Sequence, residues 1–263
     1  MPTNKIIWIT GASSGIGEAC AYQFAGEKSN LILTATRADR LAVVQQECIR
    51  LGARCEILPY DLSRLEQIDE LTDKALAIFG QIDIAFLNAG ISQRGKTAET
   101  DFEVDRKIMD VNFFAPVKIT KRLLLKMIEN GGGTIAVTSS ISGKFGFPLR
   151  SAYASSKFAL YGFFETVQAE YYNDHIRVVM VCPGRVRTNI SFNALEVDGS
   201  KHNLMDEGQE KGITAEKAAR KIVKAIHKQK SEVLVGGKEL LMVFINRFFP
   251  SISRRIVRKI KNT

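Results

Sequence analysis

Short apolar segments of strand character alternate with amphipathic segments of helical character along nearly the whole chain of 263 residues. Stretches such as 40–51 and 65–79 place apolar residues at helical spacing. No linker or internal repeat interrupts the pattern. The alternation predicts an α/β fold: one domain with a doubly wound parallel sheet between two layers of helices, three αβα layers in all. The predicted strands are residues 5–10, 30–35, 54–58, 82–87, 133–138, 176–182 and 232–235.

A glycine-rich turn follows the first predicted strand and reads Gly11-Ala-Ser-Ser-Gly15-Ile-Gly17. Glycines let the backbone approach a pyrophosphate closely, and the N-terminus of a helix supplies N–H donors and a partial positive charge. An ordinary tight turn would also fit this spacing. The apolar strand before the turn and the helical residues 18–24 after it favour nucleotide binding.

Tyr153 and Lys157 are spaced to share one face of a helix. An isolated phenol has a pKa of about 10, which makes it a poor proton carrier at neutral pH. A nearby ammonium group favours the phenolate, so we expect Lys157 to lower the pKa of Tyr153. The pair is therefore a candidate for general acid/base chemistry.

Six motifs occur along the chain in a fixed order, and together they resemble the short-chain dehydrogenase/reductase family in its compact, single-domain branch. They are Thr10-Gly11-Ala-Ser-Ser-Gly15-Ile-Gly17, Asn88-Ala89-Gly90, Asn112, Ser139-Ser140, Tyr153-x-x-x-Lys157 and Pro183-Gly184-Arg-Val-Arg-Thr188. The resemblance runs from about residue 5 to residue 235. It implies a Rossmann-like fold and hydride transfer between a nicotinamide cofactor and a carbonyl group or secondary alcohol.

The resemblance also implies roles for particular residues. The catalytic residues would be Asn112, Ser140, Tyr153 and Lys157. Tyr153 would transfer the proton, Ser140 would hydrogen-bond the substrate oxygen, and Asn112 would hold a water of a proton relay or, alternatively, bend or cap its helix. The cofactor-binding residues would be Gly11, Ser13, Ser14, Gly15, Ile16, Gly17, Arg37, Asp61, Leu62, Asn88, Ala89, Gly90, Tyr153, Lys157, Pro183, Gly184, Val186 and Thr188.

Cofactor choice depends on the residues after the second predicted strand. An acid there would bind the ribose 2′-hydroxyl of NAD(H), whereas arginine suits the 2′-phosphate of NADP(H). Thr36 stands at the position of the acid and Arg37 follows it. A solvated arginine at a helix start is the alternative. We favour NADP(H), with NAD(H) as the other candidate.

The substrate is less constrained by the sequence. The resemblance places the pocket after strands four, five and six, where the chain carries Ile91, Ser92, Ile141, Phe145, Phe147, Phe192 and Leu195. This apolar set suits a hydrophobic carbonyl or alcohol, such as a steroid, retinoid or lipid-like molecule, although such residues also build cores. Residues 189–212 have the glycines and polar residues of a mobile lid. The alternatives are a 3-oxoacyl thioester reductase and a non-catalytic nucleotide-sensing or scaffold protein.

The cysteine content suggests that the protein works in a reducing compartment of the cell. The four cysteines show no disulfide or zinc spacing, and the three histidines are scattered, so we expect no metal site. The first strand follows the start of the chain directly, without the apolar stretch of an export signal. We therefore expect a cytoplasmic location.

The last residues differ from those of a minimal family member. We divide the chain into a catalytic domain of residues 1–238 and a basic amphipathic segment of residues 239–263. After Glu239 there is no acid, and apolar residues recur at mostly helical spacing between six cations: Arg247, Arg254, Arg255, Arg258, Lys259 and Lys261. Such a segment can lie in an anionic membrane interface, giving a peripheral location at the membrane surface. Packing on its own domain or on a partner subunit is the alternative.

Other partners follow from charge and resemblance. The excess of positive charge, +9 over the whole chain, is concentrated at the C-terminus, and no nucleic-acid-recognition motif accompanies it. We therefore do not expect nucleic-acid binding. Relatives usually form dimers or tetramers through the helices that carry Asn112 and Tyr153. We therefore expect a homodimer or homotetramer.

Overall fold

A computed structural model describes residues 4–260 of the chain. Its centre is a seven-stranded, fully parallel sheet in the order β3-β2-β1-β4-β5-β6-β7. The strands are β1 Ile6–Thr10, β2 Asn30–Thr34, β3 Arg54–Ile57, β4 Ile84–Leu87, β5 Gly133–Thr138, β6 Ile176–Pro183 and β7 Glu232–Val235. All seven predicted strands are confirmed, and so is the predicted Rossmann-like fold of a single domain.

Helices fill the connections between the strands. They are α1 Gly15–Gly26, α2 Ala38–Arg50, α3 Ile68–Phe79, α4 Phe102–Met109, α5 Ala115–Glu129, α6 Ser151–Glu170, α7 Glu207–Glu210, α8 Ala215–His227, α9 Leu241–Phe248 and α10 Pro250–Val257. Short 3₁₀ turns lie at Leu65–Gln67, Ile141–Gly143 and Lys238–Leu240, and a π-helical turn lies at Asp110–Phe114.

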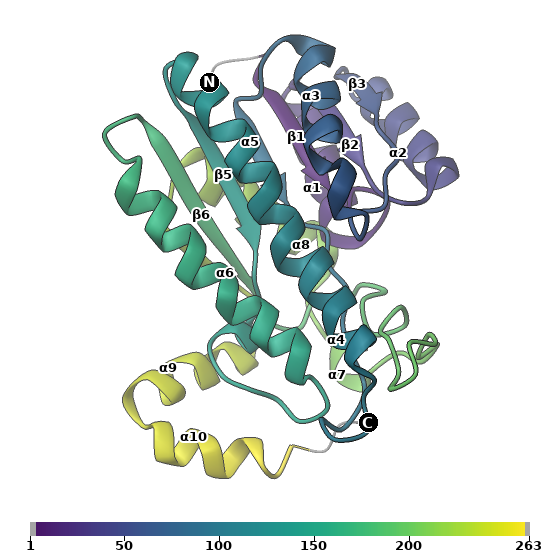
Figure 1. Ribbon diagram of the computed structural model, residues 1–263, viewed down its shortest axis with the longest axis vertical. Coiled ribbons are helices and arrows are strands. Elements are labelled where there is room, and N and C mark those ends of the chain that lie inside the picture. The colour runs from purple at the N-terminus through teal and green to yellow at the C-terminus, as the bar shows by residue number, and fades with distance from the viewer. Residues whose placement is uncertain (1–3, 261–263) are drawn as a thin grey trace.

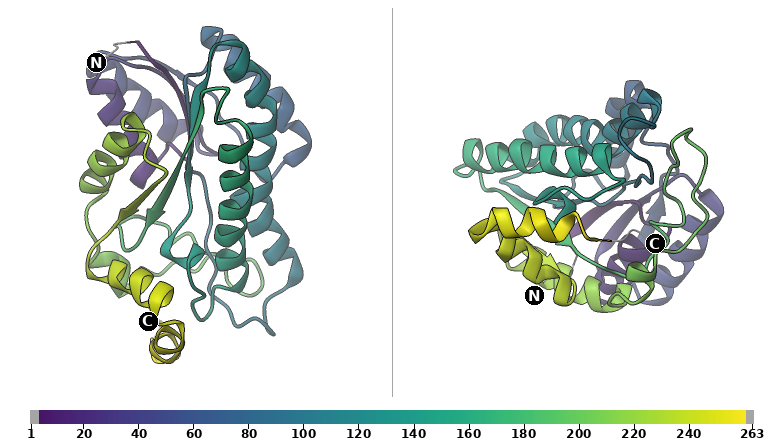
Figure 2. Two further views of the ribbon diagram at one scale, coloured as in Figure 1. Left: turned by 90° about the vertical axis from the view of Figure 1, so that its left-hand side faces the viewer. Right: turned by 90° about the horizontal axis from the view of Figure 1, so that it is seen from below.

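The sheet has an apolar core on each face because successive side chains of a strand point to opposite sides. Ile7 and Ile9 of β1 lie in the core with α1, α2 and α8. Ile6 and Trp8 lie in the core with α3, α5 and α6. Figure 2 shows the sheet from its edge, with one layer of helices on each side. Burial on both faces explains why the central strands β1, β4 and β6 read as nearly continuous apolar runs, whereas the edge strand β3 carries exposed Arg54 and Glu56.

Local sequence signals set several helix boundaries. Helix α3 ends at Gly80, whose φ of +82° favours a residue without a side chain. Helix α8 begins after Thr214, whose hydroxyl accepts a hydrogen bond from the backbone N–H of Lys217 at 3.3 Å. Pro250 opens α10, because a proline fits the first turn of a helix and cannot continue the one before it.

The strand order reverses between β1 and β4, and the carboxyl ends of these strands form one edge of the sheet. Thr10 joins them, since its hydroxyl accepts hydrogen bonds from the backbone N–H groups of Asn88 (3.0 Å) and Ala89 (3.1 Å). The hydroxyl of Thr138, at the end of β5, donates to the side-chain oxygen of Asn88 at 3.1 Å. Three strand ends are thus fixed together where a ligand is expected.

Helices α9 and α10 form a C-terminal hairpin, residues 241–257, beyond the carboxyl ends of the strands (Figure 1). One face of the hairpin packs on the catalytic domain, through contacts of Met242, Val243 and Val257 with a small core of Ile141, Phe145 and Cys182. The opposite face exposes Leu241, Phe244, Phe248, Phe249, Ile252 and Ile256. Across residues 4–260, every helix falls short of the length and apolarity needed to traverse a bilayer.

Candidate active site

A cavity of about 820 Å³ opens at the carboxyl edge of the sheet, between the glycine-rich turn, the segment after β4, helix α6 and residues 183–211. Most of the predicted site residues line it. They are Gly11, Ser13, Ser14, Gly15, Ile16, Arg37, Asp61, Leu62, Asn88, Ala89, Gly90, Ile91, Ser92, Ser140, Ile141, Tyr153, Lys157, Pro183, Gly184, Val186 and Thr188. Motifs far apart in sequence therefore meet around one space.

The glycine-rich turn leaves room that side chains would fill. A Cβ atom at Gly11 would lie 2.8 Å from the Cα of Ala89, and one at Gly17 would collide with the carbonyl oxygen of Gly11. Gly15 has a φ of +62°, a conformation that a side chain disfavours. Gly17 does not line the cavity; it lets α1 approach the turn. The N-terminus of α1 faces the cavity, as binding of a dinucleotide pyrophosphate requires.

Tyr153 lies on the first turn of α6 and its side chain is buried in the cavity wall. Burial raises the pKa of its phenol. The hydrogen bond with Ser140 and the positive charges of Arg150 and Arg94 act in the opposite direction. The phenol is therefore protonated at neutral pH and ready to act as a proton donor.

Ser140 follows β5 and is held for a contact with Tyr153. Its hydroxyl accepts a hydrogen bond from the backbone N–H of Ser142 at 3.1 Å and lies 3.4 Å from the carbonyl oxygen of Pro183. Ser139 also lines the cavity, but its hydroxyl is occupied, since it donates to the backbone carbonyl of Lys157 at 2.9 Å. Gly143 packs against the same carbonyl, so the turn after Ser140 is seated on helix α6.

Lys157 differs from the expectation drawn from its spacing. Its Nζ atom donates to the carbonyl oxygen of Thr138 at 2.8 Å and lies 5.7 Å from the centroid of the Tyr153 ring. Burial lowers the pKa of Lys157 to about 7. The pKa of Tyr153 is raised and not lowered as its spacing from Lys157 suggested, because burial outweighs the nearby positive charges. A lysine this deeply buried is a weaker source of positive charge than helical spacing suggests.

Asn112 lies in the π-helical turn and its side chain is fully engaged. Its amide nitrogen donates to the carbonyl oxygen of Ile91 at 2.9 Å and to the hydroxyl of Ser156 at 3.0 Å. Its amide oxygen accepts from the backbone N–H of Ile91 at 2.8 Å. A Cβ atom at Gly90 would lie 3.2 Å from both this oxygen and the Nζ of Lys157. Asn112 does not line the cavity, but it fixes the segment that does.

One end of the cavity is formed by residues after β2 and β3. The Nη2 atom of Arg37 lies 3.4 Å from the hydroxyl of Ser13, which joins the second strand to the glycine-rich turn. Asp61 accepts hydrogen bonds from the backbone N–H (3.0 Å) and the hydroxyl (2.9 Å) of Ser63. Leu62 is buried beside it. This end of the cavity therefore presents the positive charge of Arg37 and the apolar surface of Leu62.

The opposite end is formed by the segment after β6. Pro183 ends the strand, and Gly184 permits close packing, since a Cβ atom there would meet the side chain of Glu239. The backbone N–H of Val186 donates to the side chain of Gln209 at 3.2 Å. Thr188 reaches back to the turn of Gly15. Pro183, Gly184, Val186 and Thr188 thus form part of the cavity wall.

The predicted substrate pocket is only partly matched. Ile91, Ser92, Ile141, Phe147 and Leu195 line the cavity. The wall of the cavity leaves out two predicted members, Phe145 and Phe192. Phe145 is buried in the core under the C-terminal hairpin, with its ring 4.8 Å from that of Phe147. Phe192 lies in the segment between β6 and α7 and is 42% exposed to solvent.

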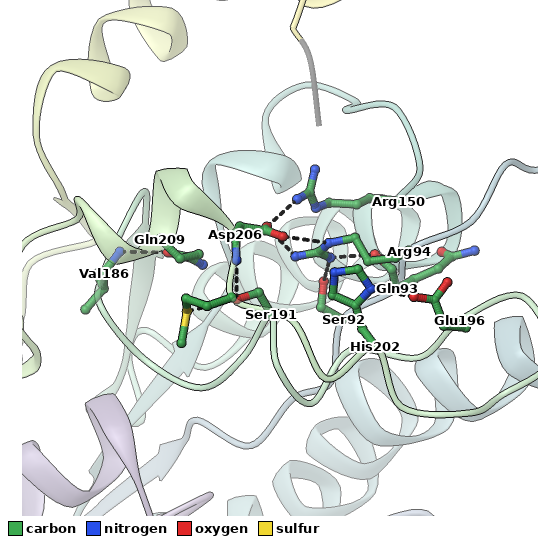
Figure 3. A network of polar contacts seen from close by, with 11 residues as sticks. Ser92, Gln93, Arg94, Arg150, Val186, Ser191, Glu196, His202, Asp206 and Gln209 are labelled. Carbon is green, nitrogen blue, oxygen red and sulfur yellow. Dashed lines mark hydrogen bonds and ion pairs between the residues drawn. The ribbon is translucent and has the colours of Figure 1, made fainter. Parts of the chain in front are cut away.

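The unpredicted charged residues of the wall include a buried cluster of Arg94, Arg150 and Asp206. Asp206 directly precedes α7, and its carboxylate accepts hydrogen bonds from both guanidinium groups (Figure 3). They follow β4, precede α6 and lie between β6 and α8, so no local motif connects them. Across residues 4–260, no three His, Cys, Asp or Glu side chains gather in a way that could hold a metal ion.

The chain is similar to animal proteins along nearly its whole length. It is 37% identical over 260 residues to "Dehydrogenase/reductase SDR family protein 7-like" of Drosophila melanogaster, which covers 97% of this chain and 80% of the relative. It is 37% identical over 256 residues to "Dehydrogenase/reductase SDR family member 7B" of Xenopus tropicalis, covering 95% of this chain and 83% of the relative.

Solved structures agree with the fold. An alcohol dehydrogenase from the archaeon Thermococcus sibiricus, complexed with 5-hydroxy-NADP, has a TM-score of 0.76 at 28% identity, covering 89% of this chain and 97% of that one. A short chain dehydrogenase/reductase from Burkholderia phymatum, in complex with NAD, has a TM-score of 0.84 at 23% identity, covering 99% and 97%. The second likeness is one of fold alone.

The family model described as short chain dehydrogenase matches residues 5–198. This range contains β1 to β6, the glycine-rich turn and the Tyr153–Lys157 pair. The chain belongs to the short-chain dehydrogenase/reductase family and is an oxidoreductase that acts on alcohol or carbonyl groups.

Proposed function

We propose that the protein is an NADP(H)-dependent oxidoreductase in which Tyr153 exchanges a proton with the oxygen of a carbonyl or secondary alcohol. The observation that carries the proposal is the position of the Tyr153 phenol. It lies in the same cavity as the glycine-rich turn and is hydrogen-bonded to Ser140. A bound nicotinamide dinucleotide would supply or accept the hydride in this cavity.

The side chains around the cavity have separate roles in the proposed reaction. In the reductive direction the Oη atom of Tyr153 gives its proton to the substrate oxygen, and Ser140 donates a hydrogen bond to the same oxygen. A donor aimed at developing charge lowers the barrier by about 3–4 kcal/mol. The charges of Arg150 and Arg94 then stabilise the phenolate that remains. Lys157, with a pKa of about 7, can return a proton at neutral pH.

The contacts of Asn112, which fix the position of the cavity wall, support this proposed mechanism. Asn112 holds Ile91 through both backbone groups, and Gly90 beside it leaves space next to Lys157. We assign Asn112 to the alignment of this wall, and we propose that its main-chain atoms, not its fully bonded side chain, hold a water of the proton relay. Residues of the glycine-rich turn, of 88–90 and of 183–188 would hold the dinucleotide.

Preference for NADP(H) over NAD(H) is supported by charge. Arg37 lines the cavity at the adenosine end, and Thr36 beside it carries no negative charge that would repel a 2′-phosphate. Arginine binds phosphate through two parallel hydrogen bonds. The contact between Arg37 and Ser13 shows that the guanidinium reaches the glycine-rich turn.

The apolar wall of Ile91, Ile141, Phe147 and Leu195 supports a substrate with a hydrophobic body, such as a lipid-like ketone. Reduction of a 3-oxoacyl thioester is the second candidate, favoured by exposed cations at the cavity mouth: Lys107, Arg185, Lys201 and Lys211. Such cations would attract the phosphates of a carrier.

The test is a panel of apolar ketones, aldehydes and 3-oxoacyl thioesters, followed by absorbance of NADPH and repeated with NADH. Turnover of simple ketones supports the first candidate, and turnover of thioesters alone supports the second. If no member of either class is turned over by protein that binds NADPH, the proposed catalysis is wrong.

We also propose that the protein works at the cytoplasmic surface of an anionic membrane. The C-terminal hairpin exposes an apolar face, and the described residues after Glu239 carry five cations and no acid: Arg247, Arg254, Arg255, Arg258 and Lys259. Apolar burial and attraction to anionic lipid act together on such a surface. Lys261, the sixth cation of the sequence, lies outside the described residues.

A homodimer or homotetramer is proposed for a separate reason. Large apolar side chains are exposed on elements that follow one another in the fold. These side chains are Phe102 on α4, Phe114 in the π-helical turn, Leu125 on α5 and Phe158 on α6. Exposed apolar surface of this kind is typical of an interaction site. The elements are those that carry Asn112 and Tyr153.

A further inference from the structure

Gln93 is a polar residue buried directly behind the wall of the cavity. It follows β4 and lies between Ser92 and Arg94, which both line the cavity, yet Gln93 itself is completely shielded from solvent. A buried amide is tolerated when its polar atoms have hydrogen-bond partners. The partners of Gln93 therefore indicate what this side chain holds in place.

The side-chain oxygen of Gln93 caps helix α6. It accepts a hydrogen bond from the backbone N–H of Ala152 at 3.0 Å. The first N–H groups of a helix have no partner inside the helix, and the side chain just before the helix usually accepts from one of them. Arg150 stands at that position of α6 and has no acceptor atom in its side chain. Gln93, 59 positions earlier in the chain, supplies the acceptor.

The side-chain nitrogen of Gln93 is engaged as well. Its Nε2 atom donates to the hydroxyl of Thr100 at 3.2 Å. The same atom lies 3.5 Å from a carboxylate oxygen of Asp105 on α4 and 3.5 Å from the hydroxyl of Ser151. Since an N–H group can only donate, the contact with Ala152 also fixes which end of the amide is the oxygen. The side chain thus has one orientation, between α4 and α6.

The backbone on both sides of Gln93 is fixed in turn. The N–H of Arg94 donates to the carbonyl of Leu195 at 2.7 Å, and the N–H of Leu195 donates to the carbonyl of Ser92 at 2.9 Å. The carbonyl of Gln93 accepts a hydrogen bond from Nη1 of Arg94 at 2.6 Å (Figure 3). Gln93 is therefore an anchored support for the helix it caps.

The capped residue directly precedes the residue that carries the reacting phenol. Ala152 and Tyr153 both belong to the first turn of α6. Helix ends fray when their free N–H groups lack partners. A displacement of about 1 Å at a reacting group can cost about 10²-fold in rate. The hydrogen bond to Ala152 is therefore placed to control the position of Tyr153.

We propose that Gln93 is a positioning residue, which fixes the first turn of α6 so that the phenol of Tyr153 meets the substrate oxygen in a productive geometry. It acts through the backbone of Ala152 and touches neither substrate nor cofactor. The inference rests on the proposed function, because Tyr153 is the proton donor proposed there. A contribution of Gln93 to the stability of the fold alone is the competing explanation.

Replacing Gln93 by Met keeps a side chain of similar length and removes the amide. With NADPH and an apolar ketone, we expect kcat to fall by about tenfold to a hundredfold. KM should stay close to that of the wild type, because the phenol acts in the transition state. Thr100→Val, which removes the hydroxyl that holds Nε2, should lower kcat in the same way but less, and it carries the test if Gln93→Met does not fold.

Gln168→Met is the matched control. The side-chain oxygen of Gln168, near the other end of α6, accepts a hydrogen bond from the backbone N–H of Val178 at 2.6 Å. This variant therefore loses the same kind of bond on the same helix, away from the cavity, and should keep its kcat. Equal effects of Gln93→Met and Gln168→Met on kcat would show a role in stability alone and would overturn the inference.

A double-mutant cycle shows whether Gln93 acts through Tyr153. Tyr153→Phe already lacks the hydroxyl, so adding Gln93→Met should lower its residual kcat by a much smaller factor than in the wild type. The same factor in both backgrounds would mean that the two residues act independently, against the inference. Unchanged activity in Tyr153→Phe would instead contradict the proposed function, so the two proposals fail separately.

Hydrogen exchange gives a readout that does not need turnover. In the full-length, cofactor-free protein the amide of Ala152 should exchange slowly, although it lies in the first turn of a helix. Gln93→Met should accelerate its exchange, and Gln168→Met should leave it as in the wild type. Equal exchange of this amide in the wild type and in Gln93→Met would show that Gln93 does not cap α6 and would overturn the inference.

Discussion

The Nζ atom of Lys157 donates to the carbonyl oxygen of Thr138 at 2.8 Å while lying 5.7 Å from the centre of the Tyr153 ring. The lysine is therefore held by the last residue of β5 and not by the phenol four residues before it. The charges of Arg150 and Arg94 oppose the rise in the pKa of the phenol that burial causes. The surroundings of the phenol therefore include charged groups outside the Tyr-x-x-x-Lys motif.

Replacing Tyr153 by Phe tests the proton donor. The change removes one hydroxyl, so turnover should fall by about 10²–10⁴-fold, the usual contribution of a general acid. Binding of NADPH, measured by its fluorescence, should be largely retained. Tyr161→Phe is the matched control, because its hydroxyl on the same helix donates to Glu232 at 2.6 Å and does not line the cavity. Full activity in Tyr153→Phe would exclude the assignment.

Replacing Arg37 by Asp tests the cofactor preference. The new carboxylate repels a 2′-phosphate and accepts hydrogen bonds from a ribose hydroxyl. We expect the ratio of kcat/KM for NADPH over NADH to fall by at least about tenfold to a hundredfold. Arg64→Asp, an exposed change outside the cavity, should leave the ratio as it is. An unchanged ratio in the Arg37 variant would place the phosphate elsewhere.

The buried Lys157 makes stability depend on pH. Its pKa is lowered to about 7 in the folded protein, whereas an unfolded lysine titrates near a pKa of about 10.4. Between these values unfolding takes up a proton, so the contribution of Lys157 to the free energy of unfolding rises with pH. The slope approaches about 1.4 kcal/mol per pH unit.

The measurement is urea unfolding of the cofactor-free protein between about pH 7 and about pH 10, the limits set by these two pKa values. Lys157→Met should remove the slope, and Lys121→Met, an exposed change on α5, should retain it. A wild type and a Lys157→Met protein with the same pH dependence would show that the lysine is not buried in solution.

Membrane contact is tested by flotation with lipid vesicles. The full chain should float with vesicles containing phosphatidylserine and much less with pure phosphatidylcholine, since each cation near an anionic surface contributes about 1 kcal/mol. Phe244→Gln combined with Phe248→Gln removes apolar area from the exposed face and should reduce flotation. Val43→Gln with Ile49→Gln, equally exposed on α2, is the control. Equal flotation of both double variants would exclude a specific role of the hairpin.

Assembly is tested by light scattering after gel filtration. Phe158→Glu places a charge in the centre of the proposed subunit contact and should convert an oligomer into a monomer. The same charge at Val43, which is exposed on the opposite layer of helices, should change nothing. A monomeric wild type would remove the proposal.

Sequence reasoning succeeded where the information is local. Strand ends, the glycine-rich turn and the four-residue spacing of Tyr153 and Lys157 depend on neighbours along the chain. The sequence did not predict the cluster of Arg94, Arg150 and Asp206, because these residues come into contact only when three separate segments meet in the fold. Phe145 and Phe147 show a second limit: two positions apart in a turn, one enters the core and the other the cavity.

The effect of Lys157 on Tyr153 was not predictable for a related reason. Helical spacing predicted that the two side chains share one face of the helix. It could not predict how deeply Lys157 is buried or that its Nζ atom donates to the carbonyl oxygen of Thr138. The π-helical turn at Asn112 likewise leaves no sequence pattern that distinguishes it from an α-helix.

The small core under the C-terminal hairpin joins the hairpin to the turn that begins at Ser140, since Ile141 and Phe145 of that region pack with Met242, Val243 and Val257. A version of the protein shortened before residue 241 would leave these apolar side chains without cover and would loosen the turn that begins at Ser140. Shortened versions should therefore retain residues 241–257 so that this turn stays packed.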